Sequence, residues 1–279
     1  MTHLISAAEL AQEIDQEIDV VVLDVRWALT TANTSAGRDD YAAGHVPSAY
    51  FVDLDTELAA PAGNGGRHPL PDPVVVQAVL RRAGITPGSR VVAYDGKESY
   101  AAARAWWVLR WLGIADVRVL DGGYAAWLAA GLPVSTETPV DRHGDVEVTP
   151  GQLPTIDADG AASLARDGML LDARAPERYA GESEPIDPVA GHVPGAVNSP
   201  TTAWLAEDGS FRRDLAEHWA TVQGDRVGAV GVYCGSGVTA AHHLLALAEV
   251  GVDGALYAGS WSEWIRDPSH PVATGHEPG

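Results

Sequence analysis

The sequence has 279 residues, 46% hydrophobic and 20% charged, a balance that describes a globular protein rather than a disordered one. Its formal net charge of −20 would repel the phosphates of nucleic acid and an anionic membrane surface, so neither is expected as a partner. No apolar run approaches the roughly 18 residues of a membrane span. The length suggests two domains.

The first residues, MTHLISAAELAQEIDQEID, lack the basic and apolar regions of a secretory signal. Ser6 and Glu9 have the spacing of a capping box and predict the start of a helix. Cys234 is the single cysteine, which excludes an internal disulfide and a multi-cysteine zinc site. We therefore predict a cytoplasmic protein. No motif indicates a metal or a nucleotide, so no cofactor is expected.

Four segments of the first half return in the second half, which indicates a duplicated domain. The pairs are VVLDVRW (21–27) with LLDARAP (170–176), GHVPSAYFV (44–52) with GHVPGAVNS (191–199), RVVAYDG (90–96) with VGVYCGS (230–236), and VLDGGYAAW (119–127) with LYAGSWSEW (256–264). Within each half, short apolar runs alternate with helical patterns such as 74–84 and 239–251. This alternation predicts an α/β fold in which each domain has a mainly parallel sheet flanked by helices.

The polar, proline-containing stretch 135–155 is interpreted as a connection between the domains. We predict a non-catalytic domain over 1–137, a linker over 138–154 and a catalytic domain over 155–279. Glycines that follow helical patterns predict left-handed caps, at Gly84, Gly113, Gly131 and Gly251.

The repeat separates structural residues from candidates for chemistry. Residues present in both halves are interpreted as strand-end ion pairs and turn hydrogen bonds: Asp24 and Arg26 with Asp172 and Arg174, and His45 with His192. Cys234 occurs in the second half only, because the equivalent strand end of the first half carries Asp95. One half is therefore predicted to be active and the other silent.

Cys234 follows a predicted strand over 227–233 and precedes a helix expected to begin near Ala240, so it should lie at the carboxyl end of a parallel strand. Gly235 and Gly237 tolerate positive φ and crowd no neighbour, so the amides of the intervening turn can point inward as an anion-binding nest. Those amides and the helix N-terminus would favour the thiolate, which is the nucleophilic form of cysteine. An inert buried cysteine is the structural alternative.

With this loop the chain resembles the two-domain sulfurtransferases of the rhodanese family, whose cysteine loop ends in Gly-Val-Thr-Ala. The resemblance runs from Leu23-Asp24-Val25-Arg26 through both Gly-His-Val-Pro motifs to Gly259-Ser260-Trp261. It implies tandem rhodanese-like domains, a persulfide on Cys234 and a silent first domain. The loop CGSGVT is similar to that of 3-mercaptopyruvate enzymes, whereas thiosulfate enzymes carry Cys-Arg-Lys-Gly-Val-Thr. It also implies donor contacts from Gly235, Gly237, Val238 and Thr239.

Attack of the thiolate on mercaptopyruvate sulfur releases the enolate of pyruvate, which must be protonated. Ser236 is suited to this step, and the resemblance implies a relay of Ser236 with His68 and Asp55. His68 lies in an interval that is eight residues longer in the first half than in the second. This Gly/Pro-rich stretch is therefore expected to reach the second domain. The alternative is an exposed loop histidine.

Arg178 is the predicted clamp for the donor carboxylate, because a guanidinium matches a carboxylate with two parallel hydrogen bonds. Its equivalent in the first half is Asp40. Pairing with Glu177 or Glu182 is the structural alternative. Many mercaptopyruvate enzymes carry a second arginine in the segment that here reads GESEPIDPV, and Arg67 is the nearest substitute.

Two alternative functions remain open at this point. Thiosulfate:cyanide sulfurtransfer would use the same persulfide, and a stoichiometric sulfur carrier or redox sensor would use the cysteine without turnover. A Cys-x5-Arg phosphatase is disfavoured, because Ala240 stands where that arginine would be. The expected partners are a small anionic sulfur donor and, as acceptor, a small thiol, a thioredoxin-like protein or cyanide.

Overall fold

The computed structural model describes residues 2–16, 18–28 and 36–279. They form two compact units. The first comprises Met1–Ala60, Leu70–Gln152 and Ala206–Phe211, and the second comprises Pro61–Pro69, Leu153–Leu205 and Arg212–Gly279. The division after Gln152 falls inside the predicted linker; the predicted domain bounds themselves stay a prediction. The segment Pro61–Pro69 comes from the first half of the sequence but belongs to the second unit.

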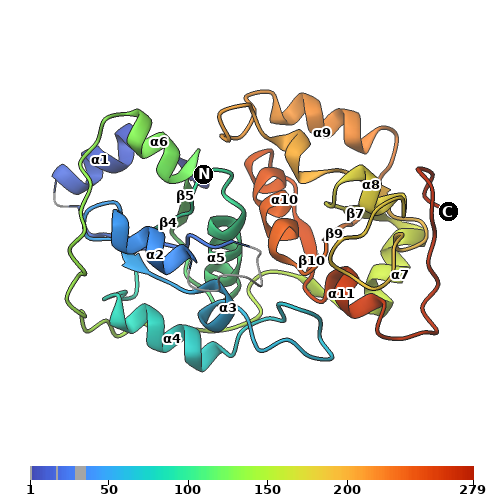
Figure 1. Ribbon diagram of the computed structural model, residues 1–279, viewed down its shortest axis with the longest axis horizontal. Coiled ribbons are helices and arrows are strands. Elements are labelled where there is room, and N and C mark those ends of the chain that lie inside the picture. Colours follow the sequence, from blue (N-terminus) through green and yellow to red (C-terminus); the bar gives the residue numbers. More distant parts are fainter. Residues whose placement is uncertain (1, 17, 29–35) are drawn as a thin grey trace. The chain divides into compact units, whose positions relative to one another are not determined.

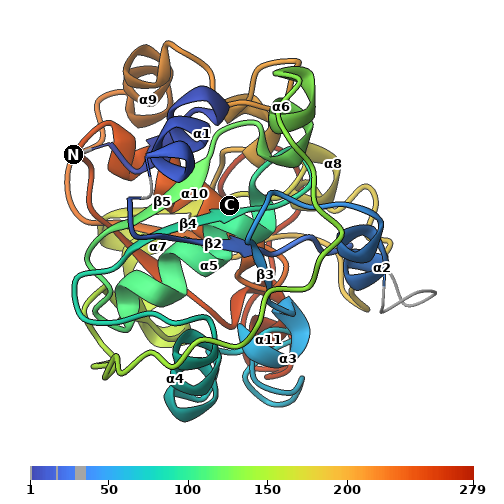
Figure 2. The same ribbon diagram turned by 90° about the vertical axis from the view of Figure 1, so that its left-hand side faces the viewer.

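The first unit is built on a five-stranded parallel sheet with helices on both faces (Figures 1 and 2). The strand order is β1-β5-β4-β2-β3, with β1 (Leu4–Ile5), β2 (Val20–Asp24), β3 (Tyr50–Phe51), β4 (Arg90–Tyr94) and β5 (Val117–Leu120). Its helices are α1 (Ala7–Asp15), α2 (Ala36–Ala43), α3 (Leu54–Glu57), α4 (Pro73–Arg82), α5 (Tyr100–Trp111) and α6 (Gly123–Ala129).

The second unit repeats this topology. Its strand order is β6-β10-β9-β7-β8, with β6 (Thr155–Ile156), β7 (Met169–Asp172), β8 (Val197–Asn198), β9 (Val230–Tyr233) and β10 (Gly254–Tyr257). The helices are α7 (Ala158–Asp167), α8 (Pro176–Tyr179), the 3-10 turn η1 (Thr201–Trp204), α9 (Leu215–Gln223), α10 (Val238–Glu249) and α11 (Ser260–Trp264). All strand pairs are parallel in both sheets, which confirms the predicted fold class.

Each sheet is buried because apolar side chains project from both of its faces. In the first unit α1 and α6 cover one face, where Leu10 and Trp127 pack on Val22 and Val92. In the second unit α7 and α11 occupy the equivalent place, with Trp261 and Trp264 against Leu170 and Tyr233. The opposite faces are covered by α5, which packs on β4 and β5, and by α10, which packs on β9 and β10. Burial on both faces explains why the strands read as continuous apolar runs.

The residues shared by the two halves have structural roles, as predicted. Asp24 and Arg26 form a buried ion pair of 2.7 Å, and Arg26 also donates to the carbonyl of Gly44. Asp172 and Arg174 repeat the pair at 2.6 Å. The two histidines of the Gly-His-Val-Pro motifs are fully buried and hydrogen-bond main-chain carbonyls, His45 with Tyr41 and Glu137, and His192 with Tyr179 and Pro278.

The predicted helix ends are confirmed. Ser6 and Glu9 form a capping box at the start of α1, and all four predicted cap glycines have positive φ. Two bounds differ from the prediction. β9 begins at Val230 rather than Val227, because Val227 is 85% exposed and Gly228 has a φ of +123°. α10 begins at Val238 rather than near Ala240, because Gly237 makes the turn by itself.

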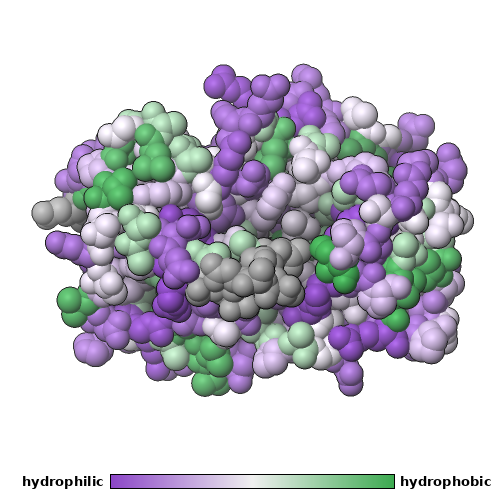
Figure 3. Space-filling view, viewed as in Figure 1, coloured by the Kyte–Doolittle hydropathy of each residue, from purple (hydrophilic) through white to green (hydrophobic). Residues whose placement is uncertain are grey.

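The surface seen in Figure 3 is mainly hydrophilic. Figure 3 shows a face on which hydrophilic residues predominate and hydrophobic ones are scattered, and the exposed large hydrophobic residues are spread along the chain. Among the residues that the structure describes, no helix is long and apolar enough to cross a membrane.

Candidate active site

Cys234 lies where β9 ends and the chain turns into α10. It is 2% exposed, and its Sγ accepts the backbone N–H groups of Ser236 at 3.5 Å and Gly237 at 3.1 Å. The N-terminus of the twelve-residue helix α10 lies directly behind these amides. Two inward N–H groups and the positive end of a helix dipole favour an anion at the sulfur. The turn is therefore suited to hold a thiolate and then a persulfide.

The two loop glycines are required for different reasons. Gly237 has a φ of +81°, and a Cβ there would lie 2.5 Å from the carbonyl oxygen of Ala258. Gly235 has no positive φ, so its tolerance of that conformation is not used, whereas the expectation that it crowds no neighbour agrees with the structure. A Cβ at Gly235 would instead lie 2.8 Å from Nη2 of Arg67 and 3.5 Å from two nitrogens of Arg178. Gly235 therefore provides room for two guanidinium groups beside Cys234.

Gly237→Ala is expected to lower the free energy of unfolding by about 3 kcal/mol, because positive φ is unfavourable for alanine and because its Cβ would clash with the carbonyl oxygen of Ala258. Gly251→Ala is the matched control. Gly251 has a φ of +74° in the same unit and no neighbouring heavy atom within 4 Å, so only the cost of positive φ, about 1 kcal/mol, should appear. Urea unfolding of both variants measures the difference. Equal losses of unfolding free energy in the two variants would show that the close approach to the Ala258 carbonyl at position 237 does not destabilise the protein.

Ser236 and His68 are brought together in the second unit. Oγ of Ser236 lies 2.8 Å from Nδ1 of His68, and the two residues are 6% and 8% exposed. His68 is carried by Pro61–Pro69, whose backbone bonds to α11: the N–H of Arg67 donates to Oγ of Ser262 at 3.0 Å. This contact explains what the longer interval of the first half does. His68 is therefore not an exposed loop histidine, which was the alternative interpretation.

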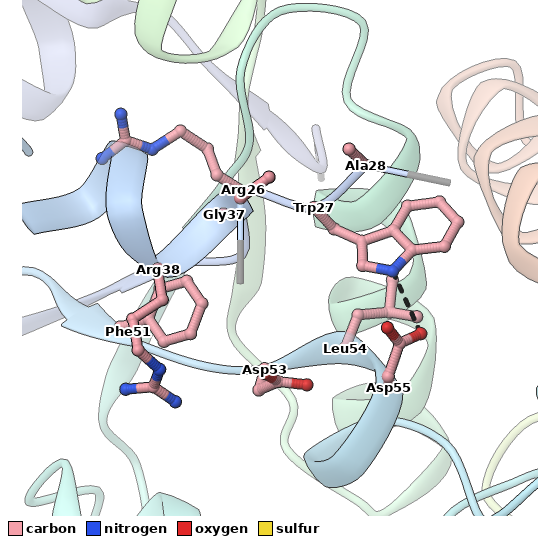
Figure 4. Close-up of a pocket in the computed structure, with 10 residues that line it drawn as sticks. Arg26, Trp27, Ala28, Gly37, Arg38, Phe51, Asp53, Leu54 and Asp55 are labelled. Atoms are coloured by element: carbon pink, nitrogen blue, oxygen red, sulfur yellow. Dashed lines mark hydrogen bonds between the residues drawn. The ribbon is translucent and has the colours of Figure 1, made fainter. Parts of the chain in front are cut away.

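Asp55 lies in the first unit, at the beginning of α3. Its carboxylate accepts the indole N–H of Trp27 at 3.0 Å, as the dashed line in Figure 4 shows. Both residues line a small pocket of that unit together with Asp53 and Arg38. The participation of Asp55 in the proton relay stays a prediction.

Val238 and Thr239 occupy the first turn of α10, where backbone N–H groups have no partner within the helix. Val238 is buried and Thr239 is partly exposed. The amides that bond to Sγ are those of Ser236 and Gly237. Donor contacts by Val238 and Thr239 therefore stay a prediction.

Arg178 lies at the end of α8 and pairs with two carboxylates that the sequence interpretation did not anticipate. Glu184 accepts from its Nη2 at 2.7 Å and Asp187 accepts from the same atom at 3.2 Å. Asp187 also pairs with Arg67. Burial alone would raise the pKa of Glu184, but hydrogen bonds from Arg178 and from nearby backbone amides bring that pKa below its usual value. Glu177 and Glu182, the alternative partners, are not those that bind Arg178.

A signal for these carboxylates is present in the sequence. Three positions separate Tyr41 from Gly44 in the first half, whereas twelve separate Tyr179 from Gly191 in the second. The additional residues include Glu184 and Asp187. An insertion confined to the half that carries Cys234 marks its residues as candidates for the site.

The rhodanese-like domain model matches residues 6–130 and 157–267, which is most of the chain. The chain belongs to the rhodanese-like family. A Pseudomonas aeruginosa protein named "Probable 3-mercaptopyruvate sulfurtransferase" is 47% identical over 98% of both chains. A Mycobacterium tuberculosis protein named "Putative thiosulfate sulfurtransferase SseB" is 46% identical over 98% of this chain and 97% of its own. The solved 3-mercaptopyruvate sulfurtransferase of Leishmania major is 29% identical, with a TM-score of 0.82 over 96% of this chain and 76% of its own.

The loop of the first rhodanese-like unit holds a carboxylate where the second holds the thiol. Asp95 is 6% exposed and accepts four backbone N–H groups, those of Lys97, Ser99, Ala101 and Ala102, at 2.9 to 3.3 Å. Burial raises the pKa of Asp95 to about 6, although these amides act in the opposite direction. In both units, the turn that follows the equivalent strand thus points backbone amides at an acidic side chain.

Proposed function

We propose that this protein transfers a sulfane sulfur from a small anionic donor, 3-mercaptopyruvate, through a persulfide on Cys234. The Cys234 thiolate attacks the sulfur of the donor, the donor's C–S bond breaks, and its electron pair stays on carbon as the pyruvate enolate. The enolate takes one proton and leaves as pyruvate. An acceptor then attacks the outer sulfur of the persulfide and restores the thiolate, so ping-pong kinetics are expected.

The observation that carries this proposal is the pair of backbone amides directed at Sγ of Cys234, 3.1 and 3.5 Å away. These donors stabilise a negative charge on the attacking sulfur and, after the first step, on the persulfide. A structural cysteine in an apolar core has no need of such donors. Membership of the rhodanese-like family and the names of the related proteins support the same chemistry.

Three features support mercaptopyruvate as the donor. The loop offers no cationic side chain at positions 235 and 236 to help sulfite leave. The Ser236 hydroxyl, hydrogen-bonded to His68, is suited to deliver the proton that the enolate requires. Arg178 can bind the donor carboxylate beside the loop. The relative named as a thiosulfate sulfurtransferase favours thiosulfate as the second candidate donor.

The acceptor is proposed to be a small thiol, a thioredoxin-like protein or cyanide, each of which provides a nucleophile for the outer sulfur. A single free cysteine supports a cytoplasmic location. This mechanism differs from that of a sulfur carrier without turnover, because the two half-reactions together return Cys234 to its starting form.

The donor is tested by measuring pyruvate release from 3-mercaptopyruvate and thiocyanate formation from thiosulfate and cyanide, with one enzyme preparation in one buffer. We expect kcat/KM to be at least about 100-fold higher for mercaptopyruvate, the effect of one well-placed proton donor. A preference for thiosulfate would keep the persulfide and overturn the donor assignment. Single-turnover labelling without catalysis would instead support the carrier function.

A further inference from the structure

Two guanidinium groups face the backbone immediately after the nucleophile. Nη2 of Arg67 is the nearest atom to the open side of Gly235, and both terminal nitrogens of Arg178 lie within 3.5 Å of the same point. Arg67 comes from Pro61–Pro69, next to His68, whereas Arg178 comes from α8. One segment thus brings both a relay residue and a second cation to the cysteine loop.

Asp187 holds the two guanidiniums together. Its Oδ1 pairs with Nη1 of Arg67, and its Oδ2 accepts from Nη2 of Arg178 at 3.2 Å. The Asp187 side chain is 4% exposed, whereas those of Arg67 and Arg178 are 23% and 16% exposed. The carboxylate is therefore the most deeply buried member of this group, and the cations retain the solvent-accessible part.

Each guanidinium keeps hydrogen-bond donors for a ligand. Within the described part of the chain, Nη2 of Arg67 and Nη1 of Arg178 have no partner, and Nε of Arg67 is buried without one. Nη2 of Arg67 and Nη1 of Arg178 are among the atoms nearest to Gly235. Donors that are left over on two cations at one place are suited to a carboxylate, which takes two or more charge-assisted hydrogen bonds.

The formal charges of the surrounding side chains cancel. The ion-pair network contains three cations and three anions: Arg67, Arg174 and Arg178 with Asp172, Glu184 and Asp187. A donor with one carboxylate adds a single charge, which the leftover N–H groups can bind. A dianion adds a second charge that no side chain of the network balances, and an unbalanced buried charge is costly.

We propose that Arg67 is the second donor-binding guanidinium of this site and that Asp187, shared by Arg67 and Arg178, selects singly charged donors over dianions. This inference rests on the proposed function for its biological meaning. Its physical content is a binding preference, which is measurable without turnover.

The charge preference is tested with Asp187→Asn, which removes one negative charge and nearly preserves the shape of the side chain. In a Cys234→Ser background, dissociation constants are measured by calorimetry for pyruvate, a monoanion, and thiosulfate, a dianion. We expect the ratio of thiosulfate to pyruvate affinity to rise by about 10-fold, the effect of one partly screened charge. An unchanged ratio would overturn the proposal, and so would failure of the Cys234→Ser protein to bind either anion.

Glu182→Gln is the matched control for Asp187→Asn. It removes the same charge five residues away, but the Glu182 side chain is 61% exposed and pairs only with the exposed His276 among the described residues. The affinity ratio should stay within about 2-fold of its starting value, since an exposed charge is screened by solvent. A shift of the affinity ratio equal to that of Asp187→Asn would assign the effect to the net charge of the protein. It would refute the proposal that Asp187 discriminates locally between monoanions and dianions.

The role of Arg67 is tested with Arg67→Gln in the otherwise native enzyme. Loss of a charge-assisted hydrogen bond to the donor should raise KM for mercaptopyruvate by about 10-fold with kcat changed less than about 3-fold. Ser262→Ala is the control, because it removes the bond that positions the Arg67 backbone and leaves the guanidinium in place. If both variants lower kcat and leave KM unchanged, Arg67 only positions His68 and the proposal fails.

Failure of this inference and failure of the proposed function have different signatures. If the protein turns over neither donor but Asp187→Asn shifts the affinity ratio as expected, sulfur transfer is refuted and the role of Asp187 in anion selection stands. If the protein transfers sulfur while Asp187→Asn leaves the affinity ratio unchanged, only the role of Asp187 is refuted.

Discussion

Cys234→Ser is expected to reduce sulfur transfer from any donor by at least about 10³-fold, to the background of the assay. A serine hydroxyl fills nearly the same space, but it stays protonated near neutral pH, so the loop amides have no anion to stabilise. The variant should keep the native circular dichroism spectrum, because Sγ forms hydrogen bonds with two backbone N–H groups of its own turn, which a serine hydroxyl can also accept. Measurable turnover by this variant would contradict the assignment of the nucleophile.

The single cysteine makes the intermediate directly measurable. After incubation with donor and removal of the excess, the intact protein should gain the mass of one sulfur atom, and Cys234→Ser should gain none. No peptide mapping is needed, because the chain contains no second thiol. Addition of cyanide should return the mass to its starting value with one equivalent of thiocyanate. A sulfur that stays bound under these conditions would favour a sensor or carrier over an enzyme.

The fold could be predicted from the sequence because the two repeated halves of the chain can be compared with each other. Motifs such as Gly-His-Val-Pro occur twice, and the residues common to both copies proved to be buried contacts such as Arg26 with Asp24. Continuous apolar strands alternating with helices then leave a parallel sheet as the simplest solution. The bounds were less accurate near Gly228 and Gly237, where the backbone conformation of a single residue decides where an element begins.

The candidate site was only partly predictable. Cys234 and Ser236 lie on one continuous turn, so local sequence was sufficient to bring them together. His68 needed the additional hint of a longer interval in one half. Asp187 was missed because its role depends on two arginines that are 120 and 9 positions away in sequence, which no local pattern reports.

Gly235 illustrates a second limit of local reasoning. A glycine in a loop is usually interpreted as a residue that needs positive φ. Here the reason is space: the side chains of Arg67 and Arg178 approach the backbone where a Cβ would stand. The residue that permits this approach is adjacent to Cys234, whereas the residues that make it are distant in sequence. Only the assembled unit reveals why the position excludes larger side chains.

Ser236→Ala is expected to lower kcat for mercaptopyruvate by about 100-fold, the usual contribution of a positioned proton donor. The same change should lower thiosulfate turnover by less than about 3-fold, because sulfite leaves as an anion and needs no proton on carbon. Both reactions pass through the same persulfide, so thiosulfate serves as an internal control for correct folding of the loop. Equal losses would mean that Ser236 only shapes the turn.

His68→Asn separates proton delivery from hydrogen bonding by Ser236. Asparagine can still bond to the Ser236 hydroxyl, whose distance from Nδ1 of His68 is 2.8 Å, but it does not titrate. If the histidine replenishes the proton, this variant should lose most of the mercaptopyruvate activity, measured as kcat for pyruvate release. Retained activity would assign the proton to water. In that case the preference for a keto-acid donor would depend on the paired guanidiniums rather than on the hydroxyl.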